Sequence, residues 1–430
     1  MERYKVSVFN INFHHDVAEY EIYYNTYSGA LVALESSIDA FLPEISSDQT
    51  ITQTLIKQGF LVPMHCDETQ KLLIERNEAI FGMSSVQLHY DIAPTLKCQA
   101  RCFYCFENKA EKASAMTQQT ADSVIDYIES QVKKYNTRKL HVTYFGGEPT
   151  LEHDRLVYIG EKLKLFSQAE GVEFSAKMIS NGILLDEKKT KELVTRTNLT
   201  EVQITLDGLR DTYASIKRID AFDKVVQNIC CICDRVKVII RLNVSKANFP
   251  EIQLLIEYLL DEMNLDGRVK IYLAKIENTD GCDFESSNCL EDMKYEDYRQ
   301  QLYKKLAPKY KSIHIEDLVP KVRHNFCGLE RVNSAVIAPT GLLYKCEKAI
   351  GLDGKEIGNV WDGKYYNNEE LQFYSPLPPK CVTGCPLLPV CFGGCPYVRN
   401  GCFAPNNCDM KKAQLINSLS TYFDCMTSHS

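Results

Sequence analysis

The chain has 430 residues and a formal net charge of −8 at pH 7, with 25% charged and 45% hydrophobic residues. This composition is typical of a globular protein with a sizeable core, so it excludes intrinsic disorder, and the absence of a Lys/Arg run disfavours a nucleic-acid partner. No apolar run approaches the roughly 20 residues that cross a bilayer, and the N-terminus lacks the apolar region of a signal peptide. We therefore expect a cytoplasmic protein with no membrane partner.

Residues 1–82 predict a small domain of strands and short helices. Alternating apolar residues predict strands near residues 4–8 and 20–24. Asn25 to Ser28 can cap a helix from Gly29 to about Phe41. A second helix is expected around residues 48–56, followed by a strand at 60–62. This order favours a winged-helix-like domain.

Residues 83–310 alternate between strand and helix patterns. The expected strands are Val86–Ile92, Leu140–Phe145, Val172–Ile179, Glu201–Leu206, Val236–Val244 and Val269–Ala274. The expected helices are Ala121–Lys134, Leu156–Ala169, Lys188–Thr195, Val225–Cys233 and Ile252–Met263. Such alternation predicts an α/β fold, a partial (β/α)6 barrel of the TIM type, whose functional residues gather at the C-terminal strand ends. Residues 311–430 lose this alternation and predict a third, cysteine-rich domain folded around metal.

Cysteine is unusually common, with 18 residues in the chain. In a large chain without a secretion signal, this indicates metal or redox chemistry. Cys98, Cys102 and Cys105 follow the first barrel strand in one short loop. A structural zinc site needs four protein ligands, whereas three cysteines on a [4Fe–4S] cubane leave one iron open to bind a substrate or cofactor.

Two motifs together resemble the radical S-adenosylmethionine (radical SAM) superfamily. The first is the C-x3-C-x2-C loop with Tyr104 before its last cysteine, and the second is Gly146-Gly147-Glu148-Pro149 after the next strand. The resemblance implies a [4Fe–4S] cluster that binds S-adenosylmethionine and generates a 5′-deoxyadenosyl radical. It also implies that the glycines and Glu148 contact the amino group of that cofactor.

The resemblance implies further cofactor contacts from the next strand ends. The candidates are Ser180, Asn181, Thr205, Asp207 and Arg241. Ser180 and Thr205 suit the ribose because a hydroxyl both donates and accepts. Asp207 has two interpretations, a ribose contact or a cap on the following segment, and Arg241 could form a fork with the carboxylate. No residue stands out as a general base, and the catalytic residues stay unknown.

The C-terminal cysteines resemble the seven-cysteine SPASM domain, which carries two auxiliary [4Fe–4S] clusters. The resemblance assigns one set to the distal cluster, Cys381, Cys385, Cys391 and Cys408, and another to the proximal cluster, Cys327, Cys346 and Cys395. Two features depart from the family pattern: three residues separate Cys381 from Cys385, where the family usually has two, and the proximal set lacks a fourth ligand. Cys282 and Cys289 are distant candidates for that ligand, and Cys402 competes with Cys408. A zinc-ribbon array is the alternative, although seven thiols fit sets of four poorly.

SPASM proteins largely act on peptides, so the resemblance implies a ribosomal-peptide maturase, as in sactipeptide and ranthipeptide thioether formation. Residues 1–82 would take a leader peptide as an added strand, and flavodoxin or ferredoxin would donate electrons. The expected product is a thioether cross-link from cysteine. The alternatives are carbon–carbon cross-linking, formylglycine formation by an anaerobic sulfatase-maturating enzyme, and a non-enzymatic iron–sulfur carrier.

Overall fold

The computed structural model describes residues 3–14, 20–43, 48–81, 87–109, 115–276, 288–324, 326–363, 376–396 and 408–427. The chain forms two compact units. Residues 83–315 and 333–371 form the barrel unit, and residues 1–82, 316–332 and 372–430 form the terminal unit. Within the described residues, every helix is too short or too polar to cross a bilayer.

The barrel unit is built on a nine-stranded sheet with the order β11-β10-β9-β8-β7-β6-β12-β13-β14. Six neighbouring strands are parallel: β6 (Gln87–Ile92), β7 (Lys139–Tyr144), β8 (Glu173–Ser180), β9 (Leu199–Thr205), β10 (Lys237–Val244) and β11 (Val269–Lys275). At the other edge, β12 (Ala335–Ile337) is parallel to β6, and β13 (Leu342–Tyr344) and β14 (Gly358–Asn359) are antiparallel. The predicted α/β fold with a parallel sheet is therefore confirmed.

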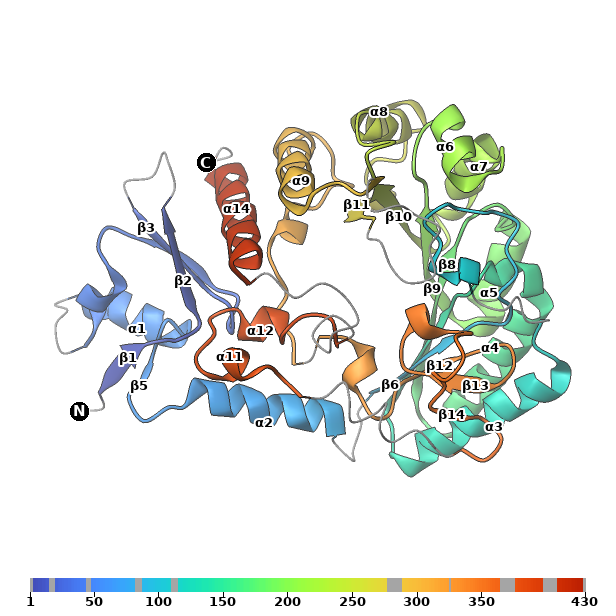
Figure 1. The fold of residues 1–430 in the computed structure, drawn as a ribbon, viewed down its shortest axis with the longest axis horizontal. Helices are drawn as coiled ribbons and strands as arrows, with labels where there is room; N and C mark the ends of the chain where they lie inside the picture. Colours follow the sequence, from blue (N-terminus) through green and yellow to red (C-terminus); the bar gives the residue numbers. More distant parts are fainter. Residues whose placement is uncertain are drawn as a thin grey trace. The chain divides into compact units, whose positions relative to one another are not determined.

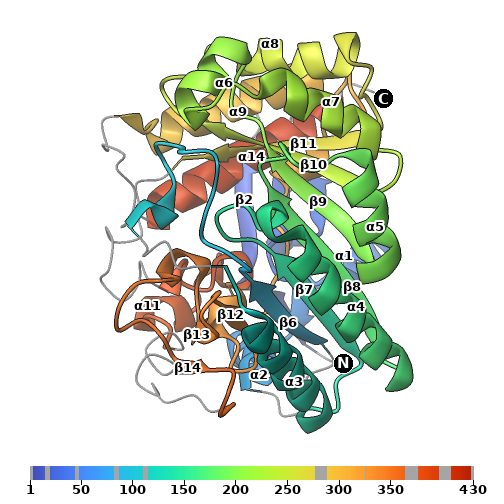
Figure 2. The same ribbon diagram turned by 90° about the vertical axis from the view of Figure 1, so that its right-hand side faces the viewer.

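Helices connect the parallel strands and cover one face of the sheet (Figures 1 and 2). They are α3 (Gln118–Lys134), α4 (His153–Ala169), α5 (Glu187–Thr197), α6 (Arg210–Lys217), α7 (Phe222–Ile232) and α8 (Ile252–Glu257) with a π-helical continuation (Tyr258–Glu262). A further helix, α9 (Asp292–Leu306), follows β11. Short 3₁₀ turns lie at Phe106–Lys109, Pro149–Glu152 and Glu347–Ala349. Side chains cap two of these helices: Thr117 accepts from the Thr120 amide at the start of α3, at 3.1 Å, and Asp186 accepts from the Lys189 amide at the start of α5, at 2.9 Å.

Burial alternates along the strands, so each strand has two different faces. In β8, Phe174, Ala176 and Met178 are buried, whereas Ser175 and Lys177 are partly exposed. Period-two alternation places the second set on the opposite face of the sheet. This inner face is polar, which is unusual for parallel strands.

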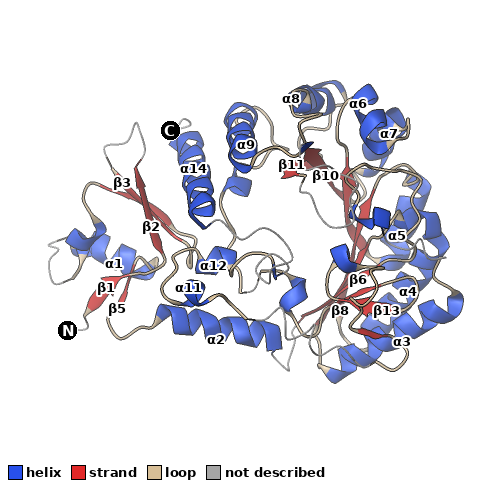
Figure 3. Cartoon of the chain, viewed as in Figure 1, coloured by secondary structure: helices blue, strands red, loops and turns tan. Residues whose placement is uncertain are grey.

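The terminal unit contains two small antiparallel sheets (Figure 3). β1 (Tyr4–Val6) pairs with β5 (Leu61–Pro63), and β2 (Asn10–His14), β3 (Glu21–Asn25) and β4 (Leu31–Leu34) form a three-stranded sheet. The helices are α1 (Gln49–Lys57), α2 (Glu68–Phe81), α11 (Pro379–Val382), α12 (Leu388–Cys391) and α14 (Cys408–Thr427), with 3₁₀ turns at Ile38–Phe41, Ile315–Leu318 and Gly328–Glu330.

The helix expected from Gly29 to Phe41 was a wrong prediction, because this segment forms β4 and a 3₁₀ turn. The Asn25 side chain accepts from the amides of Tyr27 and Ser28, at 3.0 and 2.8 Å, which builds a turn and not a helix cap. Gly29, with φ of 75°, closes the turn by donating its amide to the Asn25 carbonyl. The chain then forms β4, which pairs antiparallel with β3 as a hairpin.

Residues from both ends of the chain share the core of the terminal unit. Phe9 and Leu72 pack with Cys381, Leu388 and Phe392. A second cluster joins Phe13, Ile22 and Tyr24 to Leu419 of α14. A buried ion pair between Arg76 and Glu330, at 2.9 Å, adds a polar link. The N-terminal segment is thus packed with the cysteine-rich segment. The winged-helix description and the boundaries at residues 82 and 310 stay predictions.

Candidate functional site

A cavity of about 540 Å³ lies in the barrel unit where the strands end. Its lining comes from the cysteine loop, the turn after β7, the ends of β8 and β9, and the end of α6. The lining residues that matter here are Cys98, Cys102, Tyr104, Cys105, Gly146, Gly147, Ser180, Asn181, Thr205 and Lys217. The cavity therefore gathers all three cysteines of the loop and most of the predicted cofactor contacts.

The two glycines after β7 hold the start of the cysteine loop. The amides of Gly147 and Glu148 donate to the carbonyls of Thr95 and Lys97, at 3.2 and 2.9 Å. A Cβ atom on Gly146 would lie 2.5 Å from the Thr95 oxygen, and one on Gly147 would lie 2.3 Å from the Lys97 oxygen. Only glycine fits this close approach. The glycines thus contact the backbone that leads into Cys98, in addition to lining the cavity.

Glu148 is fully buried and is not among the residues that line the cavity. Its carboxylate accepts from the Thr150 amide at 3.0 Å, the Ser180 hydroxyl at 2.9 Å and the Asn181 amide at 2.7 Å. Burial raises the pKa of Glu148, while these hydrogen bonds act against that rise. In this arrangement Glu148 ties the turn after β7 to the end of β8, and both of its oxygens are occupied by the protein.

Asn181 links the end of β8 to the first cysteine. Its side-chain amide donates to the Cys98 sulfur at 3.6 Å, and its oxygen accepts from the Ile183 amide at 3.0 Å. Burial raises the pKa of Cys98 to about 11.

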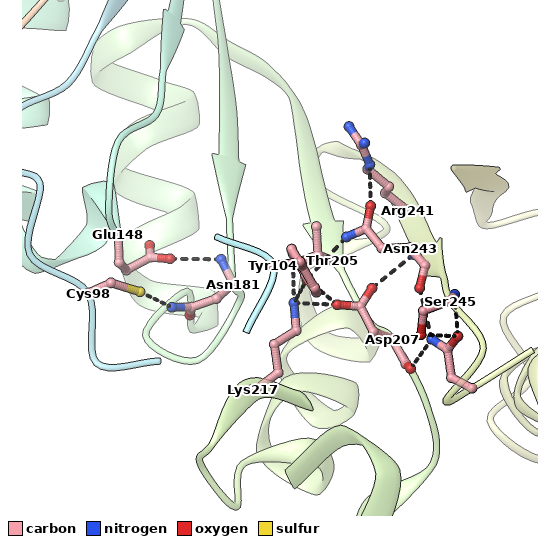
Figure 4. Close-up of polar contacts among 11 residues, drawn as sticks. Cys98, Tyr104, Glu148, Asn181, Thr205, Asp207, Lys217, Arg241, Asn243 and Ser245 are labelled. Atoms are coloured by element: carbon pink, nitrogen blue, oxygen red, sulfur yellow. Dashed lines mark hydrogen bonds and ion pairs between the residues drawn. The ribbon is translucent and has the colours of Figure 1, made fainter. Parts of the chain in front are cut away.

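A buried polar cluster includes Tyr104, Thr205 and Lys217, which line the cavity, and Asp207 and Asn243, which do not. Figure 4 shows the contacts within this cluster. Lys217 and Asp207, 1% and 0% exposed, form an ion pair at 2.7 Å. The Tyr104 hydroxyl donates to the same Asp207 oxygen, and the other oxygen accepts from the Asn243 amide at 2.9 Å. Burial by itself would lower the pKa of Lys217, but Asp207, Cys102 and Tyr104 raise it well above its usual value. Asp207 does not line the cavity, and its carboxylate is occupied by these three residues.

Arg241 lies outside this cavity. Its Nε donates to the Asn243 side-chain oxygen at 2.8 Å, and Figure 4 shows the guanidinium extending away from Lys217 and Asp207. A contact with the cofactor carboxylate stays a prediction for this residue.

The sequence analysis missed Lys217 and Asn243. Both belong to the cluster, since Asn243 also donates from its side chain to the Tyr104 hydroxyl at 3.2 Å. One signal was available for Lys217: it lies four residues after Tyr213, on the face of α6 that also buries Ile216. A lysine on a buried helical face requires a partner, and Asp207 is that partner.

The thiols of the cysteine loop fit an iron–sulfur cluster by their donor chemistry, because three sulfur ligands from one loop face one cavity. Among the residues that the structure describes, no three His, Cys, Asp or Glu side chains converge to hold a metal ion. Cluster binding therefore requires these side chains to turn toward a common centre. Cys289, a candidate ligand in the sequence analysis, packs beside Ile276 and Phe103 in an apolar cluster.

The cysteines assigned to the distal cluster lie near one another in the terminal unit. Burial raises the pKa of Cys381, and the neighbouring thiols of Cys385, Cys391 and Cys408 raise it further. Two lysines are adjacent: Lys411 donates to the Cys391 sulfur at 3.8 Å, and a hydrogen bond to Cys408 raises the pKa of Lys380.

The assignment of the other three cysteines to the proximal cluster stays a prediction. Cys327 and Cys395 belong to the terminal unit and Cys346 to the barrel unit. The alternative ligands Cys282 and Cys402 lie outside the described residues.

A second cavity of about 590 Å³ lies on the polar inner face of the sheet. Its lining includes His89, Asp91, His141, Thr143, Ser175, Lys177, Ile179, Glu201 and Gln203. Ile179 also lines the first cavity, so the two cavities are adjacent. His89 contacts Asp91 at 3.0 Å and Thr143 at 2.8 Å, and His141 contacts Ser175 at 2.9 Å.

Comparison with known proteins identifies the family of this region. Residues 92–259 match the Radical SAM superfamily. A probable GTP 3',8-cyclase of Saccharolobus solfataricus is 29% identical over 163 residues, which are 37% of this chain and 49% of that protein. A probable GTP 3',8-cyclase of Archaeoglobus fulgidus is 32% identical over 171 residues, 39% of this chain and 53% of that protein. This chain spans about half the length of the curated relatives it matches.

Solved structures share the fold at lower identity. Native anSMEcpe with bound AdoMet has a TM-score of 0.56 and 18% identity, covering 80% of this chain and 98% of that chain. Streptococcus suis SuiB bound to S-adenosylmethionine has a TM-score of 0.52 and 15% identity, and the match covers 92% of this chain and 94% of that chain. SuiB bound to precursor peptide SuiA has a TM-score of 0.52 and 14% identity, and the match covers 91% of this chain and 95% of that chain. Together, the matched family, the parallel sheet and the cysteine-lined cavity show that the barrel unit contains a radical SAM domain.

Proposed function

We propose that this protein is a radical SAM maturase of a ribosomally synthesised precursor peptide. The observation that carries the proposal is the first cavity, where the thiols of Cys98, Cys102 and Cys105 lie with the polar ends of β8 and β9. The radical SAM domain implies a [4Fe–4S] cluster that binds S-adenosylmethionine, and these three thiols would hold it. When bound, the cluster and S-adenosylmethionine together supply a 5′-deoxyadenosyl radical, which takes a hydrogen atom from the substrate.

The protein's own residues would bind and orient the cofactor. Thr205 lines the cavity, and its hydroxyl accepts from Lys217, so its proton is free to donate to a cofactor hydroxyl. The Gly146-Gly147 turn closes the cavity beside Cys98 without a side chain. Glu148 would act indirectly, by fixing the positions of Ser180 and Asn181.

Peptide substrates are supported by the proteins that share this fold. SuiB was solved with precursor peptide SuiA, and anSMEcpe with Cp18Cys and Kp18Cys peptides. In the terminal unit, β2 and β4 are the edge strands of a three-stranded sheet among the described residues. An exposed edge accepts an extended peptide through main-chain hydrogen bonds, so we assign the leader peptide to this sheet.

The proposed reaction is thioether cross-linking of a cysteine in the precursor. Auxiliary [4Fe–4S] clusters held by the C-terminal cysteines would accept the electron released after hydrogen abstraction, and flavodoxin or ferredoxin would reduce the first cluster. Carbon–carbon cross-linking and formylglycine formation share the same first step and are the alternatives.

A second candidate function is cyclisation of a small nucleotide. The observation that favours it is the match to probable GTP 3',8-cyclases across the radical SAM domain. A nucleotide substrate would need neither the sheet edges nor the distal cysteines of the terminal unit.

Mass spectrometry distinguishes these candidates. The anaerobically reconstituted protein is incubated with S-adenosylmethionine, a reductant and either candidate precursor peptides or GTP. We expect a cysteine-containing peptide to lose two hydrogens per cross-link and GTP to stay unchanged. Cys102→Ala should abolish the product, whereas Cys231→Ala, at an exposed thiol, should retain it. Consumption of GTP with every peptide unchanged would overturn the proposal.

A further inference from the structure

Lys217 is buried and uses its full hydrogen-bonding capacity inside the protein. Its ammonium donates to the Tyr104 hydroxyl at 2.7 Å and to the Thr205 hydroxyl at 2.8 Å, and contacts Asp207 at 2.7 Å. A lysine ammonium has three N–H donors. All three are occupied, so Lys217 has no donor left for a ligand although it lines the cavity.

Each partner of Lys217 connects it to a different part of the site. Tyr104 belongs to the cysteine loop, Thr205 ends β9, and Asp207 follows β9. The backbone adds a second link to the loop, since the Lys217 carbonyl accepts from the Arg101 amide at 2.9 Å. The cysteine loop is therefore held to the end of α6 by main-chain and side-chain bonds from one residue.

The bond to Thr205 determines which way that hydroxyl can act. A hydroxyl that accepts from an ammonium retains its own proton for donation. Thr205 lines the cavity, so this proton is available to a ligand there.

We infer that Lys217 is a positioning residue of the S-adenosylmethionine site, which orients the Thr205 hydroxyl as a donor to the bound cofactor and fixes Tyr104 of the cysteine loop. The inference rests on the radical SAM part of the proposed function and is independent of the peptide substrate. A purely structural ion pair would stabilise the barrel but would not couple energetically to Thr205 in cofactor binding.

A double-mutant cycle on the reconstituted full-length protein separates these roles. The variants are Lys217→Met, Thr205→Val and the pair together, and the measurements are iron content, the dissociation constant of S-adenosylmethionine, and the change in the reduced-cluster EPR spectrum on adding it. Each single substitution should weaken binding about tenfold, the loss expected for one hydrogen bond. The double variant should bind no more weakly than Lys217→Met alone, because loss of Lys217 already removes the orientation of the Thr205 hydroxyl.

Two further variants keep the test decisive. Lys237→Met removes an exposed lysine that pairs with Glu201 at 2.7 Å and should bind S-adenosylmethionine as the parent does. Lys217→Met leaves the Asp207 charge buried and can fail to fold. In that case the double variant Asp207→Asn/Lys217→Met, which removes both buried charges, takes the place of Lys217→Met in the cycle. Unchanged binding on loss of Lys217, or additive effects with Thr205→Val, would overturn the inference. Failure of the peptide assay alone would leave these binding results unaffected and would count only against the peptide substrate.

Discussion

At the residue scale, Gly147 is the position where a single methyl group should damage the site most directly. Its added Cβ would lie 2.3 Å from the Lys97 carbonyl oxygen, which belongs to the backbone that enters the cysteine loop. Backbone atoms cannot move aside as the end of a flexible side chain can. Small changes of this kind in a packed region typically cost about 1–3 kcal/mol, and here the strain falls on the segment that carries Cys98.

We therefore predict that Gly147→Ala lowers the iron content and weakens S-adenosylmethionine binding. Gly171→Ala is the control, because nothing lies within 4 Å of its added Cβ. With φ of 68° at Gly171, this control should cost only about 1–2 kcal/mol of backbone strain and leave iron and cofactor binding unchanged. Equal iron content and cofactor affinity in the two variants would contradict this account of the glycine pair.

The residue scale also shows what the sequence could predict about the site. The strand order and the family resemblance together pointed to Cys98, Gly146, Ser180 and Thr205, and all four line one cavity. The hydrogen bonds of Glu148 to Ser180 and Asn181 could not be anticipated, because these donors lie at the end of the neighbouring strand β8. Sequence spacing does not reveal such tertiary partners.

At the element scale, β7 carries a titratable group that should make stability depend on pH. Burial and the neighbouring His89 lower the pKa of His141 to about 4, from an ordinary value of 6.5. Between these values the unfolded chain binds more protons than the folded chain, so stability rises with pH there. The contribution of neutral His141 to the free energy of unfolding is complete above about pH 6.5. It is lost as the pH falls toward 4.

We predict that His141→Gln flattens this decline. The melting temperature of the parent should fall more between pH 7 and pH 5 than that of the variant, when both are measured by circular dichroism with the same cluster loading. His14→Gln, at a side chain that is 81% exposed, should follow the parent. Parallel curves for His141→Gln and the parent would show that His141 does not control the slope.

The parallel strands were the elements predicted best. The six parallel strands were expected within one or two residues of their observed ends, since each carries a buried apolar face. Helix α6 was missed, and with it the position of Lys217. The longer helices α2, α9 and α14 were missed as well. The segment after Asn25 was misread because a side-chain turn and a helix cap use the same residue types.

At the scale of the whole molecule, the chain order does not match the compact units. Residues 1–82 share a core with residues 316–332 and 372–430, while residues 333–371 join the barrel unit. Local sequence patterns predict elements, but the packing of distant segments depends on tertiary contacts such as those of Phe9 with Cys381 and Leu388. The cysteine-rich segment was therefore expected as one domain, while its residues divide between the two units.

The account as a whole depends on an open iron at the Cys98–Cys105 loop, and EPR of the reduced protein tests this most directly. A variant with alanine at the seven C-terminal cysteines should keep one [4Fe–4S] signal, which shifts when S-adenosylmethionine is added. Cys102→Ala in that background should remove the signal and abolish 5′-deoxyadenosine release. Zinc in place of iron at this loop, or a cluster signal that S-adenosylmethionine leaves unchanged, would contradict the account.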